Sequence, residues 1–233
     1  MTTTFPLELL QAVSDWQRGP SEKKKIERGN TLKELIATLP AKFRSCDEPC
    51  FRQEAHEKGR TFDVLIANKL DETVAAWTTN ETIAQKFKGG VPPLGLQGII
   101  LRIMPPPGSV VANLKALYSD QDFVDAMQAN RSKIDYYENG AGKYGGTQDE
   151  VVLELGHITE AQIYSYGGYA GPFEQLVVEF VAMNGHEPSE AEQQNLAEAA
   201  GGAWWLSEEG TRIVIARTKP QFLKRIHQRL PRA

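Results

Sequence analysis

The chain has 233 residues, of which 41% are hydrophobic and 24% are charged, and its net charge is −4. This length can bury one large core or two small ones, so a soluble globular protein is expected. No apolar run approaches the roughly 20 residues of a membrane-spanning helix, and the first residues show neither a basic leader nor a small-residue cleavage site. We therefore expect no signal peptide, no membrane interaction and a cytoplasmic location.

Cysteine and histidine show none of the spacings of a metal site. Cys46 and Cys50 are the only two cysteines, and the four histidines are scattered along the chain. Zinc sites need pairs of ligands at short, characteristic spacing. The sequence therefore predicts no metal, and both thiols are expected to be buried or incidental.

Charge is unevenly distributed. Residues 211–233 carry a net charge of +7, which leaves −11 for the rest of the chain. Such asymmetry is typical of a contact with nucleic acid or with an acidic protein. A basic segment of this kind can equally dock on the chain's own acidic surface or form a solvated helix face.

Hydrophobic periodicity and turn residues predict several elements in the first half of the chain. They are helices over 7–18, 31–39 and 81–87, strands around 49–52 and 74–79, and a strand or helix at 64–67. Asn30 or Thr31 is expected to cap the second helix, after a charged run at 22–28, and Asn80 is expected to cap the third.

The second half is predicted to contain further strands and helices. They are strands over 98–104, 148–155, 175–181 and 211–216, helices over 114–129, 189–200 and 222–230, and a glycine-rich loop at 137–147. Ser189 and Glu192 have the spacing of a capping box. Short strands divided by turns, with helices at both ends of the chain, favour one α+β domain.

A glycine-rich turn brings two polar residues, Gln148 and Glu150, to the start of an apolar strand. Alternate side chains of an extended strand share a face, so Gln148 and Glu150 are predicted to point to one ligand, with Asp149 opposed. The apolar residues at 151–155 predict a strand buried on both faces. Such a strand would hold a carboxylate rigidly, as catalysis requires; alternatively, the polar pair merely ends the strand.

Three motifs stand in a fixed order along the chain. They are Arg52 on an early strand, Thr78 and Thr79 at a strand end that leads into a helix, and Gln148 with Glu150 after a glycine-rich loop. This order resembles the mono-ADP-ribosyltransferases of the Arg-Ser-Glu class over about residues 45–157. Two features depart from the family pattern: Asn80 ends a Thr-Thr-Asn run where the family has Ser-Thr-Ser, and Arg44 and Arg60 are alternatives to the early arginine.

The resemblance implies a fold and its boundaries. We expect a single ADP-ribosyltransferase-like domain of the α+β class, with a split mixed β-sheet core and flanking helices. An N-terminal helical segment would cover 1–44, the core 45–185, and a C-terminal helix-strand-helix extension 186–233.

The resemblance also implies NAD as the substrate and gives the motif residues their roles. Arg52 would bind the pyrophosphate with two donors at once, and Thr78 and Thr79 would bind NAD or hold the arginine. Glu150 would accept a hydrogen bond from the ribose 2′-hydroxyl and stabilise the cationic transition state of glycosyl transfer. Gln148 would act beside it, next to the incoming nucleophile.

The acceptor is expected to contact Gln148 and Tyr144. An amide both donates and accepts, so it suits an amide side chain or the edge of a base, whereas a carboxylate there would favour a guanidinium. Family members with Gln at this position include enzymes that act on asparagine, glutamine or nucleic-acid bases. Tyr144 would stack on a base or an apolar side chain, or else anchor the loop. An RNA or DNA base is the favoured acceptor, and a protein Asn or Gln the alternative.

An enzyme of this kind without a leader would act in its own cell. By analogy, that indicates a toxin restrained by a cognate antitoxin or inhibitor protein, in a toxin-antitoxin or phage-defence system. The alternative from another class is a non-catalytic relative that binds a nucleotide or nucleic acid. The presence of Glu150 argues against it, because a binding module has no need of that carboxylate.

Overall fold

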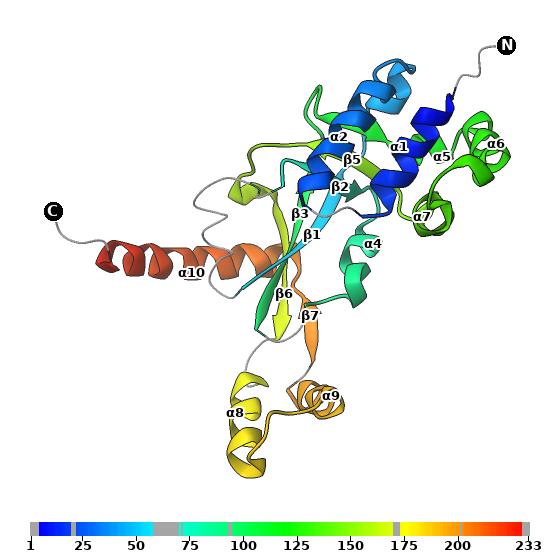
Figure 1. Cartoon of the computed structure of the whole chain (residues 1–233). Coiled ribbons are helices and arrows are strands. Elements are labelled where there is room, and N and C mark those ends of the chain that lie inside the picture. Colours follow the sequence, from blue (N-terminus) through cyan, green and yellow to red (C-terminus); the bar gives the residue numbers. More distant parts are fainter. Residues whose placement is uncertain are drawn as a thin grey trace. The chain divides into compact units, whose positions relative to one another are not determined.

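The computed structural model (Figure 1) describes residues 5–19, 22–57, 70, 72–92, 95–169, 173–200 and 202–229. The element predicted at 64–67 and the alternative arginine Arg60 lie outside these residues. So do Arg232 and the side chains of Arg225 and Arg229, which supply much of the charge of the basic segment.

The chain divides into two compact units, each made of three segments. The first unit is Met1–Arg52, Lys69–Ala84 and Arg102–Ile158, and the second is Gln53–Asn68, Gln85–Leu101 and Thr159–Ala233. Because the units are interleaved along the sequence, neither is a continuous piece of chain. The domain boundaries expected from the sequence, at 44 and 185, stay a prediction.

In the first unit, antiparallel strands follow the order β4-β5-β2-β1 and helices accompany them. The strands are β1 (Cys50–Glu57, which begins here), β2 (Val74–Thr78), β4 (Val110–Asn113) and β5 (Glu150–Glu154). The helices are α1 (Leu7–Gln17), α2 (Glu22–Ile36), α4 (Glu81–Lys86, which begins here), α5 (Leu114–Tyr118), α6 (Gln121–Ala129) and α7 (Ala141–Tyr144), with short turns η1 (Ala41–Arg44), η3 (Arg131–Lys133) and η4 (Tyr137–Asn139).

Helices α1 and α2 lie side by side, and α2 packs against β2 and β4 (Figure 1). Leu9, Val13 and Trp16 are buried on α1 at the spacing of one helix face. A Cβ atom added to Gly29 of α2 would lie 2.8 Å from Val74 Cγ1 and 3.4 Å from the Trp16 ring. Glycine therefore lets α2 approach the strand and the indole closely.

That packing explains why one prediction was wrong. A single helix covers residues 22–36, whereas the sequence predicted a charged run and a separate helix capped at Asn30 or Thr31. Glycine costs about 1 kcal/mol in a helix interior relative to alanine. Here its contact with β2 compensates for that cost, so Gly29 continues the helix instead of ending it.

In the second unit, antiparallel strands follow the order β3-β6-β7. The strands are β3 (Leu96–Ile103, which ends in the first unit), β6 (Ile163–Tyr169) and β7 (Ala203–Trp205). The helices are α8 (Phe173–Asn184), α9 (Glu190–Ala199) and α10 (Glu208–Arg229), with turns η2 (Phe87–Gly89) and η5 (Glu160–Gln162).

Trp205 packs across two neighbouring glycines in this sheet. Gly98 of β3 pairs with Gly167 of β6, and a Cβ atom at either would lie within 2.8 Å of the Trp205 ring. The indole N–H donates to the carbonyl of Gln85 at 3.0 Å. The glycines thus make room for an aromatic ring that covers the strand pair.

Two predicted strands are helices. Residues 175–181 lie in α8 and residues 211–216 lie in α10. In a strand, Thr211, Ile213 and Ile215 would share a face, but Thr211 and Ile215 are buried at 0% and 3% exposure whereas Ile213 is 58% exposed. That is the four-residue repeat of a helix, and short runs rich in β-branched residues do not distinguish it from a strand.

Smaller departures concern breaks and short turns. The helix predicted over 114–129 is divided into α5 and α6, because Asp120 between them has an extended backbone. The predicted loop at 137–147 contains the helical turns η4 and α7. Strands β4, β6 and β7 were not predicted.

Other predictions are confirmed. Asn80 Oδ1 accepts from the backbone N–H groups of Thr82 and Ile83 at the start of α4. Ser189 and Glu192 form the expected capping box. Antiparallel strands with flanking helices place the protein in the α+β class, as the sequence predicted. Among the described residues, no helix is long and apolar enough to cross a membrane.

Candidate active site

Three of the residues selected from the sequence, Tyr144, Gln148 and Glu150, line one pocket in the first unit. Its volume is about 110 Å³, and side chains of Gln17 and Tyr118 also line it. Pockets for drug-sized ligands are typically ~300–1,000 Å³. This pocket therefore suits one ring or sugar of a larger ligand, and the remainder would extend beyond it.

Glu150 is the first residue of β5 and is 5% exposed. The indole Nε1–H of Trp16 donates to its Oε1 at 2.7 Å. Nearby, the Tyr118 hydroxyl donates to Gln17 Oε1 at 2.8 Å. Helix α1, which begins the sequence of this unit, therefore orients the carboxyl group of Glu150, which lies near the end of that sequence.

Burial raises the pKa of Glu150 above its ordinary value, because water no longer solvates the charge. Hydrogen bonds from Trp16 and Gln17 and the positive charge of Lys25 act in the opposite direction without cancelling the effect. Burial likewise raises the pKa of Tyr118, and the charge of Glu150 adds to that shift. Both groups thus favour their neutral forms in this pocket.

The turn before β5 does not have the geometry predicted from strand alternation. Asp149 has a φ of 45°, in the left-handed region, and the strand begins only at Glu150. Gln148 and Glu150 therefore reach the same pocket because the chain turns between them. Asp149 lines this pocket too, where it was expected on the opposite face, and its Oδ2 accepts from Asn80 Nδ2 at 3.3 Å.

Thr78 fixes this turn from the neighbouring strand. It pairs with Glu150 across β2 and β5. Its Oγ1 donates to the carbonyl of Gln148 at 2.7 Å and accepts from the backbone N–H of Asn80 at 3.1 Å. The Thr78 hydroxyl therefore joins the end of β2 to the turn that carries Gln148.

Thr79 lies beside this junction. Its backbone N–H donates to the carbonyl of Asp149 at 3.0 Å, and its Oγ1 accepts from Lys115 Nζ at 3.0 Å. Lys115 also pairs with Glu48. The expected roles of Thr78 and Thr79 in binding NAD stay predictions.

Arg52 lies on β1 with a side chain only 15% exposed. Its Nη1 donates to the carbonyl of Ala76 at 3.1 Å, and its Nη2 pairs with Glu72. Burial alone would raise the pKa of Glu72, but hydrogen bonds and charges from Lys25 and Arg52 outweigh it and lower the pKa. A pyrophosphate at Arg52 would therefore compete with an ionised carboxylate.

Lys25 interacts with residues of the candidate site near both Arg52 and Glu150. It pairs with Glu72, the partner of Arg52, and its charge also acts on Glu150. Lys25 thus acts electrostatically on both Glu72 and Glu150. Arg44, one alternative to Arg52, donates to the carbonyl of Leu39 at 3.4 Å.

Sequence reasoning missed Trp16, Gln17, Lys25, Glu72 and Tyr118. Trp16 continues the apolar stripe of the first helix, and nothing local indicates that its N–H faces a carboxylate 134 residues later. The described part of the chain contains no group of three or more His, Cys, Asp and Glu that could hold a metal ion. Cys50 is buried, and its Sγ lies 3.8 Å from that of Cys46.

Comparison with known proteins gives one structural similarity. No family model matches the sequence, and no curated protein does. Among solved structures, the chain is similar to Vis toxin, an ADP-ribosyltransferase from Vibrio splendidus, with a TM-score of 0.29 and 11% identity over 71% of this chain. The match spans 61% of the length of Vis toxin.

Removing the hydroxyl of Thr78 tests the junction between β2 and β5. We expect Thr78→Val to lower the free energy of unfolding by about 1–3 kcal/mol, because two backbone groups lose their partner at a buried position. Urea unfolding measures this. The control is Thr38→Val, since the Thr38 hydroxyl also donates to a carbonyl, that of Leu35, but is exposed. Its loss should stay within about 0.5 kcal/mol, and equal losses would contradict the assigned role.

The raised pKa of Glu150 predicts a pH dependence of stability. A folded-state pKa above the unfolded value means that the native state binds the proton more tightly, so this contribution is present at low pH and is lost as the pH rises. We compare the unfolding free energies of the wild type and Glu150→Gln between about pH 4 and pH 8. The wild type should lose stability relative to the variant as the pH increases above about 4.5, the ordinary value. Parallel curves would mean that the pKa is not raised.

Proposed function

We propose that this protein is a mono-ADP-ribosyltransferase that transfers ADP-ribose from NAD to an intracellular acceptor, with a nucleic-acid base as the preferred acceptor. The observation that carries the proposal is the placement of Glu150. It is a buried carboxyl group at the start of a rigid strand, held by Trp16, in one pocket with Gln148 and Tyr144.

Glu150 has the capacity to act on the ribose. Trp16 and Gln17 orient its carboxyl group, and a carboxylate has about four acceptor sites, so it can also accept from the 2′-hydroxyl. In the transfer, the bond between the nicotinamide nitrogen and ribose C1′ breaks with both electrons leaving on nicotinamide, and an electron pair of the acceptor forms the new bond to C1′ as the acceptor releases its proton. A carboxylate fixed beforehand beside the resulting positive charge stabilises the transition state.

The positive charge of the substrate would counteract the effect of burial on the pKa of Glu150. Without a ligand, burial favours the neutral acid. The nicotinamide ring of NAD is cationic, and a nearby positive charge favours ionisation of a carboxyl group. Binding of NAD would therefore lower the pKa of Glu150 and produce the ionised form that the reaction needs.

Features beside Glu150 support a base as the acceptor. Gln148 provides an amide with both donor and acceptor atoms. Tyr144 is half-buried on the pocket wall, and Lys143 Nζ lies 5.0 Å from the centre of its ring. A ring that can stack on a base, next to a cation that can meet a phosphate, suits a nucleotide better than an amide side chain of a protein.

The cellular role is proposed by analogy with toxin-antitoxin and phage-defence systems. We propose a toxin that acts in the cytoplasm of the cell that makes it, under the control of an antitoxin or inhibitor protein. A second candidate function is a non-catalytic protein that binds a nucleotide or nucleic acid. The pairing of Arg52 with Glu72 favours this candidate. Arg52 is the residue expected to bind the pyrophosphate of NAD, and it already has an internal partner.

One experiment distinguishes these functions. The protein is incubated with NAD labelled in the adenylate part and with cell lysate, and separate samples are then treated with nuclease and with protease. Release of the label by nuclease supports the preferred acceptor, and release by protease indicates an Asn or Gln side chain. Absence of any transferred label would favour the non-catalytic candidate.

Glu150→Gln tests the catalytic assignment. We expect transfer to fall by a factor of about 10² to 10³, whereas NAD affinity falls much less, because the charge acts more strongly on the transition state than on bound NAD. The rate of transfer and NAD binding are measured separately. Glu154→Gln is the control, since Glu154 lies at the other end of β5 and its side chain is 42% exposed. If Glu150→Gln retains more than about a tenth of the activity, Glu150 is not the catalytic residue.

Arg52→Lys tests the pyrophosphate assignment. An ammonium can keep the charge and the pairing with Glu72 but cannot reproduce a two-point grip on a pyrophosphate. We expect NAD affinity to fall about tenfold or more, as for the loss of one hydrogen bond to a charged group. Titration of NAD against Arg52→Lys and Arg44→Lys measures this. A loss confined to Arg44→Lys would assign the role to Arg44.

A further inference from the structure

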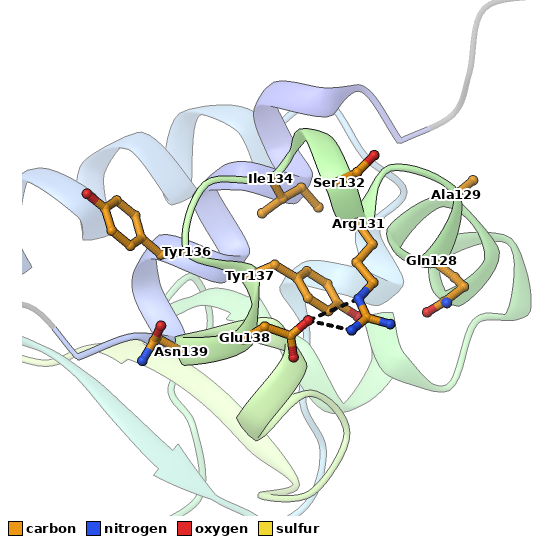
Figure 2. A pocket seen from close by; sticks show the side chains of 9 residues that line it. All are labelled: Gln128, Ala129, Arg131, Ser132, Ile134, Tyr136, Tyr137, Glu138 and Asn139. Atoms are coloured by element: carbon orange, nitrogen blue, oxygen red, sulfur yellow. Dashed lines mark hydrogen bonds and ion pairs between the residues drawn. The ribbon is translucent and has the colours of Figure 1, made fainter.

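A second, larger pocket lies in the first unit, where α6 is followed by η3 and η4 (Figure 2). Its volume is about 520 Å³, within the range of small-molecule sites. The lining residues used below are Gln128, Arg131, Tyr136, Tyr137, Glu138 and Asn139. None of them lines the pocket of Glu150. Figure 2 shows Tyr136 and Asn139 on one side of this pocket and Arg131 and Gln128 on the other, so an aromatic ring and polar groups line a site that the proposed catalysis does not use.

We propose that this pocket binds an unpaired base of a single-stranded nucleic acid, with the base stacked on Tyr136. The inference rests on the proposed function, because it assigns this pocket to the acceptor strand. The chain leads from Tyr136 through η4 and α7 directly to Tyr144 and Gln148. A strand held here would lie along the loop that carries the acceptor-facing residues.

The backbone conformation of Tyr136 is energetically unfavourable. Its φ is 56° and its ψ is 30°, in the left-handed region, and its side chain is 67% exposed. For a residue with a bulky side chain this conformation costs about 1–2 kcal/mol. An exposed ring returns little of that cost through burial, so apart from its contact with Arg18 the fold gives no reason for a tyrosine here. A ligand that stacks on the ring would give one.

One face of the ring is already occupied. The guanidinium carbon of Arg18 lies 4.3 Å from the ring centre, and Arg18 is itself held by Asp15 at 3.1 Å. Because Tyr136 remains mostly exposed despite this contact, its other face is accessible to a flat ligand. Stacking of a base on an aromatic ring contributes about 1–3 kcal/mol.

The loop that carries Tyr136 is fixed before any ligand binds. The Gln11 side chain accepts from the backbone N–H of Asp135 at 2.8 Å and donates to its carbonyl at 3.3 Å. On the other side, a Cβ atom at Gly140 would lie 2.2 Å from the carbonyl oxygen of Ser14. Both contacts are made with α1. A preformed loop loses little conformational entropy on binding.

The Arg131–Glu138 pair lies beside the Tyr137 ring, on the other side of the pocket from Tyr136 (Figure 2), where it can bind the edge of a neighbouring base of the strand. Arg131 donates to Glu138 Oε1 through Nε at 3.0 Å and Nη2 at 2.6 Å. The Glu138 carboxylate can accept from a base amino group. The amides of Gln128 and Asn139 offer donors and acceptors.

The charges of the pocket favour a single strand over a duplex. Arg18 pairs with Asp15 and Arg131 pairs with Glu138, so both of these guanidinium groups already have a carboxylate partner. Duplex binding depends mainly on cations that neutralise phosphates. A stacking ring with polar neighbours instead suits an unstacked base, which a duplex does not offer.

The test measures binding of fluorescent ten-residue oligo(U) and oligo(dU) to the full chain by anisotropy, without NAD. We expect Tyr136→Asn to weaken binding about tenfold, because the ring is lost while asparagine tolerates the left-handed backbone. Tyr136→Phe should stay within about twofold, since a phenyl ring stacks as well. Phe87→Ala is the control, because Phe87 is 44% exposed and has Lys88 Nζ 5.7 Å from its ring but lies outside the pocket.

The outcomes separate this inference from the proposed function. The assignment of the pocket is wrong if Tyr136→Asn binds the oligonucleotides as tightly as the wild type, or if Phe87→Ala loses as much affinity as Tyr136→Asn. It is also wrong if a protein partner binds at Tyr136 and the oligonucleotides do not. A fall in affinity with an unchanged salt dependence supports stacking. Failure of the proposed function would instead appear as absence of label transfer from NAD while the oligonucleotides still bind. Comparison of oligo(U) with oligo(dU), which differ only in the 2′-hydroxyl, identifies the sugar.

Discussion

The hydrogen bond from the Trp16 indole to Glu150 is the contact on which the first unit depends. A buried carboxyl group is strongly destabilising unless it has partners. Trp16 satisfies Glu150 on one side and packs against Gly29 of α2 on the other, so the two helices and β5 are positioned by one side chain. A substitution at Trp16 would therefore disturb the helical layer and the candidate catalytic residue together.

The remaining site residues also combine two tasks. Thr78 holds the turn that carries Gln148, and Asp149 binds Asn80, the cap of α4. Arg52 is engaged with Glu72 inside the first unit. The groups expected to bind NAD are thus the same groups that join neighbouring strands. An internal partner keeps such polar groups satisfied in the free protein, and a ligand has to exchange with it.

The sequence predicted the part of the candidate site whose residues lie close together along the chain. Gln148, Glu150 and Tyr144 do share a pocket, although the backbone turns at Asp149 where strand alternation was predicted. Trp16 could not be predicted as a partner of Glu150, since contacts between distant segments leave no local pattern. Residues 211–216 of α10 were mistaken for a strand, although the later part of this helix was predicted, because Thr211 to Ile215 is too short a run to reveal its period, which only the exposure of Ile213 distinguishes.

The interleaving of the two units has a consequence for the order of events during synthesis. The first unit needs chain up to Ile158, and its central hydrogen bond joins residues 134 positions apart. Closing so long a loop is entropically unfavourable and slow compared with local folding. On the ribosome, α1 emerges long before β5 exists, so a nascent chain that ends before Glu150 has its helices but no carboxyl group for Trp16 to hold. The pocket is therefore assembled late, after most of the chain has been translated.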